Sequence, residues 1–201
     1  MKLLLTSSGL TSECLSAKLR EILPAGERSK VLIVADVRGE DDRFYLCAVE
    51  AELDRIGISN HSVFDLSADS VSGDYSDIDL FYVCGGNTFH ILHRLRATGL
   101  DKVIIPQVES GRTVYLGVSA GSVIAGPSIE IAGWGSEGDK NEIGLKDLSG
   151  FGFTDTAIFP HFRDELEDEV SEFRRQVYYP VREIADGEAV YIEDGEEEFI
   201  Y

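Results

Sequence analysis

The chain has 201 residues, of which 43% are hydrophobic and 9% aromatic. This is enough to bury one sizeable core, so we expect a single domain over residues 1–201. Its 37 acidic side chains against 18 basic ones give a formal net charge of -19, which repels phosphate backbones and anionic lipid headgroups and argues against nucleic acid and a membrane surface as partners. An alternative interpretation of the acidic excess is a solubility adaptation, for instance to high salt.

The three cysteines predict neither disulfides nor a metal site. Cys14, Cys47 and Cys84 lie in apolar neighbourhoods without a C-x-x-C motif or Cys/His ligand spacing, so we expect small core residues in a reducing compartment. The apolar run at residues 3–5 ends too soon for a signal peptide. No run approaches the ~18 apolar residues of a membrane span, and we therefore expect a cytoplasmic protein.

Short apolar runs alternate with helical patterns along the first part of the chain. The pattern predicts strands at residues 3–6, 31–34, 62–66, 78–84 and 113–116. It predicts helices at residues 11–23, 41–55, 88–97 and 101–110, and one more directly after residue 119. This alternation indicates βαβ units and a mainly parallel sheet. Because the strands are apolar along their length, we expect helices on both faces.

The pattern changes after residue 125. Residues 126–150 are rich in Gly, Ser and charge, with Trp134 alone among them, and a loop this long inside a domain is often functional. A strand at residues 157–159 and an acidic helix at residues 164–178 follow. The last segment predicts a β-hairpin with Asp194-Gly195 at its turn. The expected fold is α/β, with a mainly parallel sheet and a C-terminal hairpin.

The clearest motif is G-x-S-x-G at residues 117–121, of sequence Gly-Val-Ser-Ala-Gly. It lies where the predicted strand 113–116 must turn into a helix, the context in which this motif presents a serine nucleophile at the top of a sheet. The free N–H groups of a helix N-terminus beside Ser119 suit a developing oxyanion. The alternative is a glycine-rich turn in which Ser119 merely caps the helix.

A second glycine motif, Gly85-Gly86-Asn87-Thr88, follows the predicted strand 78–84 and opens another helix. Paired glycines let backbone N–H groups approach a substrate carbonyl closely, so one of them is expected to join the N–H of Ala120 in an oxyanion hole. An ordinary strand-to-helix turn with Asn87 or Thr88 as N-cap is the other interpretation, and the two are compatible.

Of the four histidines, His161 is the best candidate for a base that activates Ser119. It directly follows a proline at the end of a predicted strand, and open α/β sheets assemble their sites at the carboxyl ends of strands. His90 and His93 share a helix at i, i+3 without a nearby third metal ligand, so we expect solvated or capping roles. His61 opens a strand and is expected to be structural, which is also the alternative for His161.

A serine-histidine pair needs a carboxylate that accepts the other imidazole N–H. The chain order serine, acid, histidine places it in the irregular segment between Ser119 and His161. The acidic side chains of that segment are Glu130, Glu137, Asp139, Glu142, Asp147 and Asp155. Spacing alone does not choose among them.

Three motifs together resemble the peptidase E family, which also contains the cyanophycinases. They are Gly85-Gly86-Asn87-Thr88-Phe89, Gly117-Val118-Ser119-Ala120-Gly121 and Pro160-His161-Phe162. Gly126-Pro127 matches as well, and the resemblance extends from the first strand to about Phe162. It implies an α/β fold similar to class I glutamine amidotransferase domains, a Ser-His-Asp/Glu triad without metal or cofactor, and hydrolysis of dipeptides with an N-terminal aspartate.

Carried over position by position, the resemblance implies Ser119 as nucleophile and His161 as base. Gly86 and Ala120 would then supply the oxyanion N–H groups. Counting back from His161 favours Asp139 as the acid. Glu137 and Glu142 lie close behind it, with Glu130 also a candidate.

The segment expected to bind the substrate differs from the family's pattern. The family's Gly-Glu-Thr-Arg-Glu segment, whose arginine binds the aspartate side chain of the substrate, is replaced by residues 163–169, of sequence R-D-E-L-E-D-E. Arg174 or Arg163 would have to take over that arginine's role, and Asn87 is also expected at the substrate. The acid-rich surroundings oppose an anionic substrate.

The sequence therefore predicts a serine peptidase that cleaves small peptides through an acyl-enzyme, with dipeptides bearing an N-terminal aspartate as the implied class. The alternatives are a cyanophycinase-like or other amide hydrolase, and a catalytically inactive peptide-binding module. The expected partner is a small peptide substrate. A homodimer is one oligomeric state compatible with the sequence.

Overall fold

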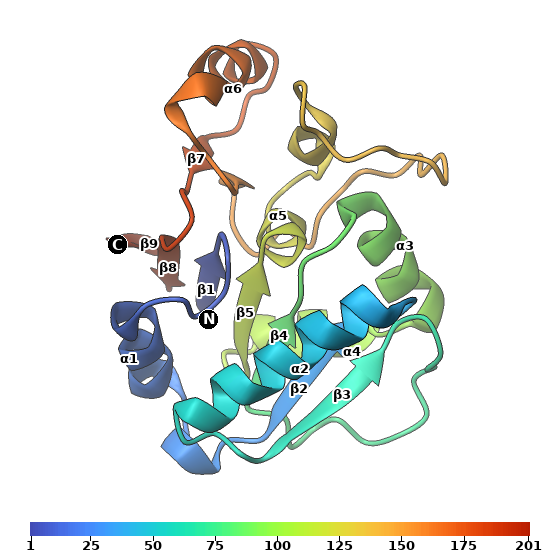
Figure 1. Ribbon diagram of the computed structural model, residues 1–201, viewed down its shortest axis with the longest axis vertical. Coiled ribbons are helices and arrows are strands. Elements are labelled where there is room, and N and C mark those ends of the chain that lie inside the picture. Colours follow the sequence, from blue (N-terminus) through green and yellow to red (C-terminus); the bar gives the residue numbers. More distant parts are fainter.

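The computed structural model covers residues 1–201 and is built around one seven-stranded sheet (Figure 1). Its strands are β1 (Lys2–Thr6), β2 (Val31–Ala35), β3 (His61–Asp65), β4 (Leu80–Val83), β5 (Val114–Val118), β8 (Ala189–Glu193) and β9 (Glu196–Ile200). Their order is β3-β2-β4-β5-β1-β8-β9. The first five run parallel, and β8 and β9 pair antiparallel at one edge. The predicted α/β fold with a mainly parallel sheet and a C-terminal hairpin is confirmed.

Helices cover both faces of this sheet. They are α1 (Glu13–Ile22), α2 (Glu40–Arg55), α3 (Thr88–Thr98), α4 (Asp101–Glu109) and α5 (Ala120–Ala125). Successive residues of a strand face opposite sides. Leu3 and Leu5 therefore share a core with α3, α4 and α5, whereas Leu4 shares one with α1 and α2. Burial on both faces explains why the strands are apolar throughout rather than alternating.

Polar side chains fix where α1 and α3 begin. The Ser12 hydroxyl accepts a hydrogen bond from the Leu15 N–H at 3.3 Å and caps α1. Asn87 Oδ1 does the same for the His90 N–H at 3.0 Å and caps α3. Such caps satisfy N–H groups that have no partner within the helix. The starts of both helices can therefore be traced to single residues of the sequence.

A second, two-stranded parallel sheet lies beyond the carboxyl ends of the main strands, near the top of Figure 1. It consists of β6 (Ala157–Phe159) and β7 (Val181–Glu183), linked through a 3-10 turn at Asp164–Leu166 and helix α6 (Glu167–Arg174). The predicted strand at residues 157–159 is confirmed, but the acidic helix ends at Arg174 rather than residue 178. Strand β7 was not predicted, because three residues after a proline carry no periodicity.

Residues 126–156 connect α5 to β6 without any helix or strand except the short 3-10 helix Glu130–Gly133. Ser128 and Ser149 pair in an isolated antiparallel bridge that closes the base of this loop. The long irregular segment expected from the sequence is thus present, and it lies beside α6, as shown by the contacts described below.

The cysteine prediction was wrong for two of the three residues. Cys84 is buried, but Cys14 and Cys47 are exposed, and all three are free thiols. Cys14 and Cys47 lie on α1 and α2, whose apolar neighbours belong to the buried face while the cysteines face solvent. None of the helices combines the length and the apolar character that crossing a bilayer demands.

Candidate active site

Ser119 lies in a sharp turn between β5 and α5. Its backbone is strained, with φ 50° and ψ -110°, a conformation that non-glycine residues rarely adopt. The turn requires small neighbours: a Cβ on Gly117 would lie 2.6 Å from the carbonyl carbon of Gly121, and one on Gly121 would lie 2.3 Å from the carbonyl oxygen of Val83. The G-x-S-x-G pattern is therefore a steric requirement of this turn.

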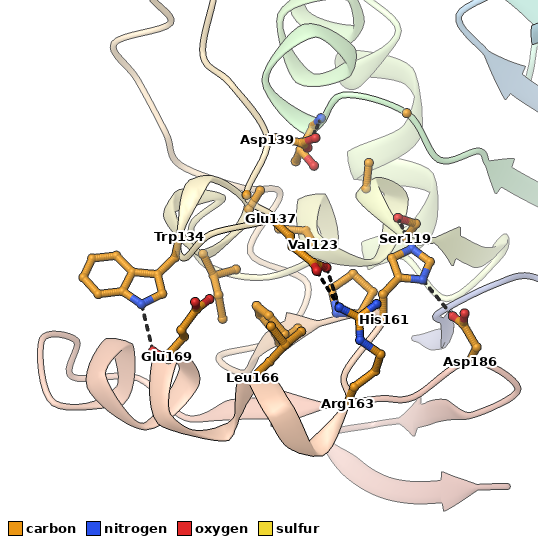
Figure 2. A pocket seen from close by; sticks show the side chains of 18 residues that line it. Ser119, Val123, Trp134, Glu137, Asp139, His161, Arg163, Leu166, Glu169 and Asp186 are labelled. Carbon is orange, nitrogen blue, oxygen red and sulfur yellow. Dashed lines mark hydrogen bonds and ion pairs between the residues drawn. The ribbon is translucent and has the colours of Figure 1, made fainter.

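His161 lies beside Ser119, as the sequence predicted. Its Nε2 is 2.9 Å from Ser119 Oγ, and its Nδ1 is 2.7 Å from Asp186 Oδ1 (Figure 2). A carboxylate only accepts hydrogen bonds, so Nδ1 donates to Asp186, and Nε2 is left to accept the Ser119 proton. His161 also has a positive φ, of 57°, which indicates that its backbone is held against its local preference.

The two sheets together explain how these residues meet. Ser119 follows β5 in the main sheet, whereas His161 and Asp186 follow β6 and β7, which pair in parallel with Phe159 opposite Glu183. Because parallel strands bring their carboxyl ends to the same edge, the residues after β6 and β7 become neighbours. Asp186 was not predicted from the sequence, because the short strand β7 that precedes it was not recognised.

Ser7 joins the same hydrogen-bond network and was also missed. It follows β1, which runs parallel to and beside β5, so it reaches the same edge as Ser119. Its hydroxyl donates to Asp186 Oδ1 at 2.7 Å and accepts from the His161 backbone N–H at 2.8 Å, and it lies 3.3 Å from His161 Nδ1. The residue is fully buried. The Ser7 hydroxyl thus fixes both the Asp186 carboxylate and the backbone of His161.

These contacts control the ionisation of Asp186. Its partial burial alone would raise the pKa of the carboxyl, but the hydrogen bonds from Ser7 and His161 and the nearby charges of His161 and Arg163 outweigh this effect, and the pKa is lowered. Asp186 is therefore a carboxylate at neutral pH, the state needed to orient an imidazole and to stabilise its positive charge.

The acid expected between Ser119 and His161 does not contact the histidine. Asp139 Oδ2 instead accepts a hydrogen bond from the Thr88 N–H at 2.7 Å, at the first turn of α3. The other candidates are engaged elsewhere or exposed: Glu137 pairs with Arg163, Glu130 lies 3.5 Å from the Tyr179 hydroxyl, and Glu142 is exposed. The assumed chain order, with the acid before the histidine, is not the order found here.

The glycine motif after β4 lies opposite the nucleophile. A Cβ on Gly85 would lie 3.2 Å from Ser119 Cβ, and Gly86 has a φ of 136° that favours glycine. Gly86 and Ala120 both line the pocket described next. Asn87 does not line it: Oδ1 caps α3, and Nδ2 donates to the Lys140 carbonyl at 3.0 Å. The capping interpretation of Asn87 accounts for its whole side chain.

A cavity of about 370 Å³ opens from Ser119 toward the long loop and α6 (Figure 2). Its apolar walls include Val123, Ile131, Trp134, Phe159 and Leu166. Its charged lining consists of Glu137, Asp139, His161, Arg163, Glu169 and Asp186. Arg174, expected at the substrate, is not part of it. The Arg174 side chain is paired with Glu183 and Glu167 instead.

The long loop and the segment from Arg163 to Glu169 both line this cavity and contact each other. Arg163 Nη2 donates to both carboxylate oxygens of Glu137, at 2.6 and 2.7 Å. The Trp134 indole N–H donates to the Glu169 carbonyl at 2.8 Å, and Ser136 N–H donates to Glu169 Oε2 at 3.0 Å. The long loop and the α6 segment are thus tied together by polar contacts beside the cavity.

The remaining histidines lie away from this cavity. His61 is 3.2 Å from Asp54, and His90 Nε2 is 3.3 Å from Asp36. Burial lowers the pKa of His90, although Asp36 opposes the effect. No group of three or more His, Cys, Asp or Glu side chains in the chain is arranged to hold a metal ion.

Comparison with known proteins identifies the family of the chain. Residues 3–200 match the family model of Peptidase family S51. The chain is 29% identical over 162 residues to a Listeria monocytogenes protein named Uncharacterized peptidase Lmo0363, with 76% of each chain covered. It is 41% identical over 88 residues to Peptidase E of Shewanella amazonensis, covering 44% of this chain and 35% of that one.

Solved structures agree as well. A candidate peptidase E protein from Listeria monocytogenes EGD-e superimposes with a TM-score of 0.79 at 25% identity, covering 99% of this chain and 97% of that one. A peptidase from an acI-B1 Actinobacterium, at 17% identity and a TM-score of 0.68, shares the fold, with 99% of this chain and 86% of that one covered. With the family model spanning almost every residue, the chain belongs to peptidase family S51 and is related to peptidase E.

Proposed function

We propose that this peptidase is a serine peptidase of small peptides, with Ser119 as nucleophile, His161 as general base and Asp186 as the carboxylate that orients the imidazole. The observation that carries the proposal is the continuous contact of Ser119 Oγ, the imidazole and the Asp186 carboxylate, at 2.9 and 2.7 Å, on the wall of a cavity. Nucleophile, base and orienting group in this order are the arrangement that activates a serine hydroxyl.

The reaction follows from these positions. His161 Nε2 removes the Ser119 proton as Oγ attacks the amide carbonyl, and the oxyanion is held by the N–H groups of Gly86 and Ala120. His161 then protonates the leaving amine, which departs and leaves an acyl-enzyme. Water, deprotonated by the same imidazole, releases the acid product and restores Ser119. Throughout, Asp186 stabilises the imidazolium.

The shape of the cavity supports small peptides as the substrates. The loop at residues 130–139 and the segment from Arg163 to α6 are joined across it by the Glu137 ion pair and the two contacts to Glu169. Two segments held together in this way favour a short peptide over a folded polypeptide. Within this class, an N-terminal aspartate is the less supported residue, because Glu137 already pairs with Arg163, the one arginine or lysine lining the cavity.

A fluorophosphonate probe tests the proposal. Such a probe phosphonylates an activated serine, so we expect wild-type protein and the exposed-loop control Ser72→Ala to be labelled at residue 119, and Ser119→Ala to remain unlabelled. His161→Ala should label at least about a thousandfold more slowly. An unlabelled, folded wild type would instead favour the inactive peptide-binding module. Rapid labelling of the His161→Ala variant would remove the histidine from its assigned role.

A further inference from the structure

Most of the charged side chains that line the cavity already have partners within the protein. Asp186 is hydrogen-bonded to Ser7 and His161, and Asp139 accepts from the Thr88 N–H. Glu137 and Arg163 neutralise each other. One further carboxylate, that of Glu169, remains at the end of the cavity away from Ser119 (Figure 2).

Glu169 is held in place on α6. Its Oε2 accepts the Ser136 N–H at 3.0 Å, and its main-chain carbonyl accepts the Trp134 indole N–H at 2.8 Å. Gly135 makes room for the carboxylate, since a Cβ there would lie 2.0 Å from Oε2. Oε1 accepts no hydrogen bond from the protein. The second oxygen of a positioned carboxylate is therefore free to bind a ligand donor.

The uncharged part of the lining is largely apolar. Val123, Ile131, Trp134 and Leu166 belong to it, and Figure 2 shows Leu166 and the mutually neutralised Glu137–Arg163 pair between Glu169 and Ser119. A side chain that enters from Ser119 therefore needs methylene groups along its length and a hydrogen-bond donor with a positive charge at its tip. Lysine and arginine combine these features, because their stems bury against apolar surface while their heads stay charged.

We propose that the cavity selects peptides in which the residue on the carbonyl side of the scissile bond is lysine or arginine, and that Glu169 recognises the cationic tip of that side chain. The inference rests on the proposed role of Ser119, because the nucleophile defines where the scissile bond lies. The α-ammonium group of the same residue is two bonds from the carbonyl carbon, so it stays near Ser119 and does not reach Glu169. An aspartate side chain is short and anionic, and its charge opposes that of the lining carboxylates.

The test compares five dipeptides that all release leucine: Lys-Leu, norleucyl-Leu, Arg-Leu, citrullyl-Leu and Asp-Leu. Norleucine and citrulline keep the approximate shapes of lysine and arginine without the charge. A charge-assisted hydrogen bond supports a roughly tenfold to hundredfold preference, so kcat/KM should be at least about tenfold higher for Lys-Leu and Arg-Leu than for their neutral counterparts, and lowest for Asp-Leu.

Glu169→Gln assigns the preference to this residue. Glutamine can keep the hydrogen bond from the Ser136 N–H while the charge is lost, so kcat/KM should fall about tenfold or more for Lys-Leu and Arg-Leu and stay within about twofold for norleucyl-Leu and citrullyl-Leu. Glu172→Gln is the matched control, because Glu172 lies on the same helix, is exposed and does not line the cavity. That variant should behave like wild type with all five peptides.

Each other outcome overturns the inference in a recognisable way. An equal loss for all five peptides in Glu169→Gln would make Glu169 structural or a ligand of the α-ammonium group. Equal turnover of lysine and norleucine peptides in wild type would remove the charge preference, and a preference for Asp-Leu would reverse it. If no peptide is cleaved, the five peptides are compared as competitors of the fluorophosphonate, with the same expected order. Loss of labelling at Ser119 in wild type would instead defeat the proposed function itself.

Discussion

The buried hydroxyl of Ser7 contacts both the Asp186 carboxylate and the main chain of His161, the histidine that faces Ser119. Ser7→Ala removes a donor to Asp186 and an acceptor for the His161 N–H, leaving both groups free to move. We expect kcat for a cleaved dipeptide to fall about 10- to 100-fold with KM nearly unchanged, because the substrate is not touched.

Ser7→Thr keeps the hydroxyl and should recover part of kcat. A thermal melt of each variant separates a loss of folded protein from a loss of rate. If Ser7→Ala raised KM and left kcat unchanged, the hydroxyl would act on substrate binding rather than on the imidazole.

Asp186→Asn and Asp139→Asn distinguish the acid found beside His161 from the one that the sequence favoured. An amide at residue 186 cannot stabilise the imidazolium and favours the wrong tautomer, so kcat should fall roughly 10³- to 10⁴-fold. The same change at residue 139 alters a helix cap and should change kcat less than about tenfold. Steady-state kinetics of both variants give the comparison, and a larger loss at residue 139 would reverse the assignment.

The lowered pKa of Asp186 predicts a pH dependence of stability. Since the folded state binds this proton less well than the unfolded state, whose carboxyl titrates near about 3.9, the stabilisation by the ionised group is present at neutral pH. It is lost as the pH falls from about 4 through the lower folded pKa. Urea unfolding of wild type and Asp186→Asn should differ at pH 7, and the difference should shrink as the pH falls below about 4. A constant difference would contradict the shift.

The sequence was informative about residues whose neighbours are sterically constrained. Ser119 was predictable because Gly117 and Gly121 are required where β5 turns under α5. His161 was predictable as the candidate base because it comes at the end of a predicted strand. Asp186 and Ser7 were not predicted, because their proximity to His161 depends on which strands pair: β7 with β6, and β1 with β5. Strand pairing of this kind has no local signature in the chain.

At the scale of elements, α5 crosses the strand ends at a close backbone contact. The Cβ of an alanine at residue 121 would lie 2.3 Å from the Val83 carbonyl oxygen, so β4 or α5 must shift. We expect Gly121→Ala to lower the free energy of unfolding by ~2 kcal/mol or more. Gly73→Ala, whose Cβ would meet nothing closer than 3.9 Å, should stay within about 0.5 kcal/mol in the same urea titration. Equal losses of stability in Gly121→Ala and Gly73→Ala would show that the backbone around residue 121 can shift to accommodate a Cβ.

The ion pair between the long loop and the segment before α6 gives a prediction about selectivity. Glu137→Gln should release the Arg163 guanidinium from charge neutralisation, and the ratio of kcat/KM for Asp-Leu to that for norleucyl-Leu should rise severalfold. Both side chains are more than half exposed, so the pair adds little to stability and the variant should fold normally. An unchanged ratio would mean that Arg163 does not face the substrate.

Most elements of the main sheet were predicted within a few residues, because their apolar runs and helical periods are long. The part that carries His161 and Asp186 was harder. Strand β7 has three residues, and β6, although predicted, belongs to a sheet of its own rather than to the main one. Apolar runs this short are compatible with either sheet, so the sequence could not show to which sheet β6 and β7 belong.

At the scale of the whole molecule, the charge of -19 predicts a response to salt. Like charges on one folded chain repel, and the Debye length falls from about 30 Å at 0.01 M to about 3 Å at 1 M salt. The melting temperature should therefore rise with sodium chloride concentration, in both a salt-adapted and an ordinary acidic protein. A flat response would show that the acidic side chains are already balanced by their local partners.

The order of the elements along the chain has a consequence for biosynthesis. A ribosome makes the strands that carry Ser7 and Ser119 first, His161 later, and Asp186 only with the segment that leads into β8, which then pairs alongside β1. A nascent chain therefore contains Ser119 and His161 before Asp186, the carboxylate that we propose orients the imidazole, has been made. Hydrolytic activity should appear only when the last hairpin docks.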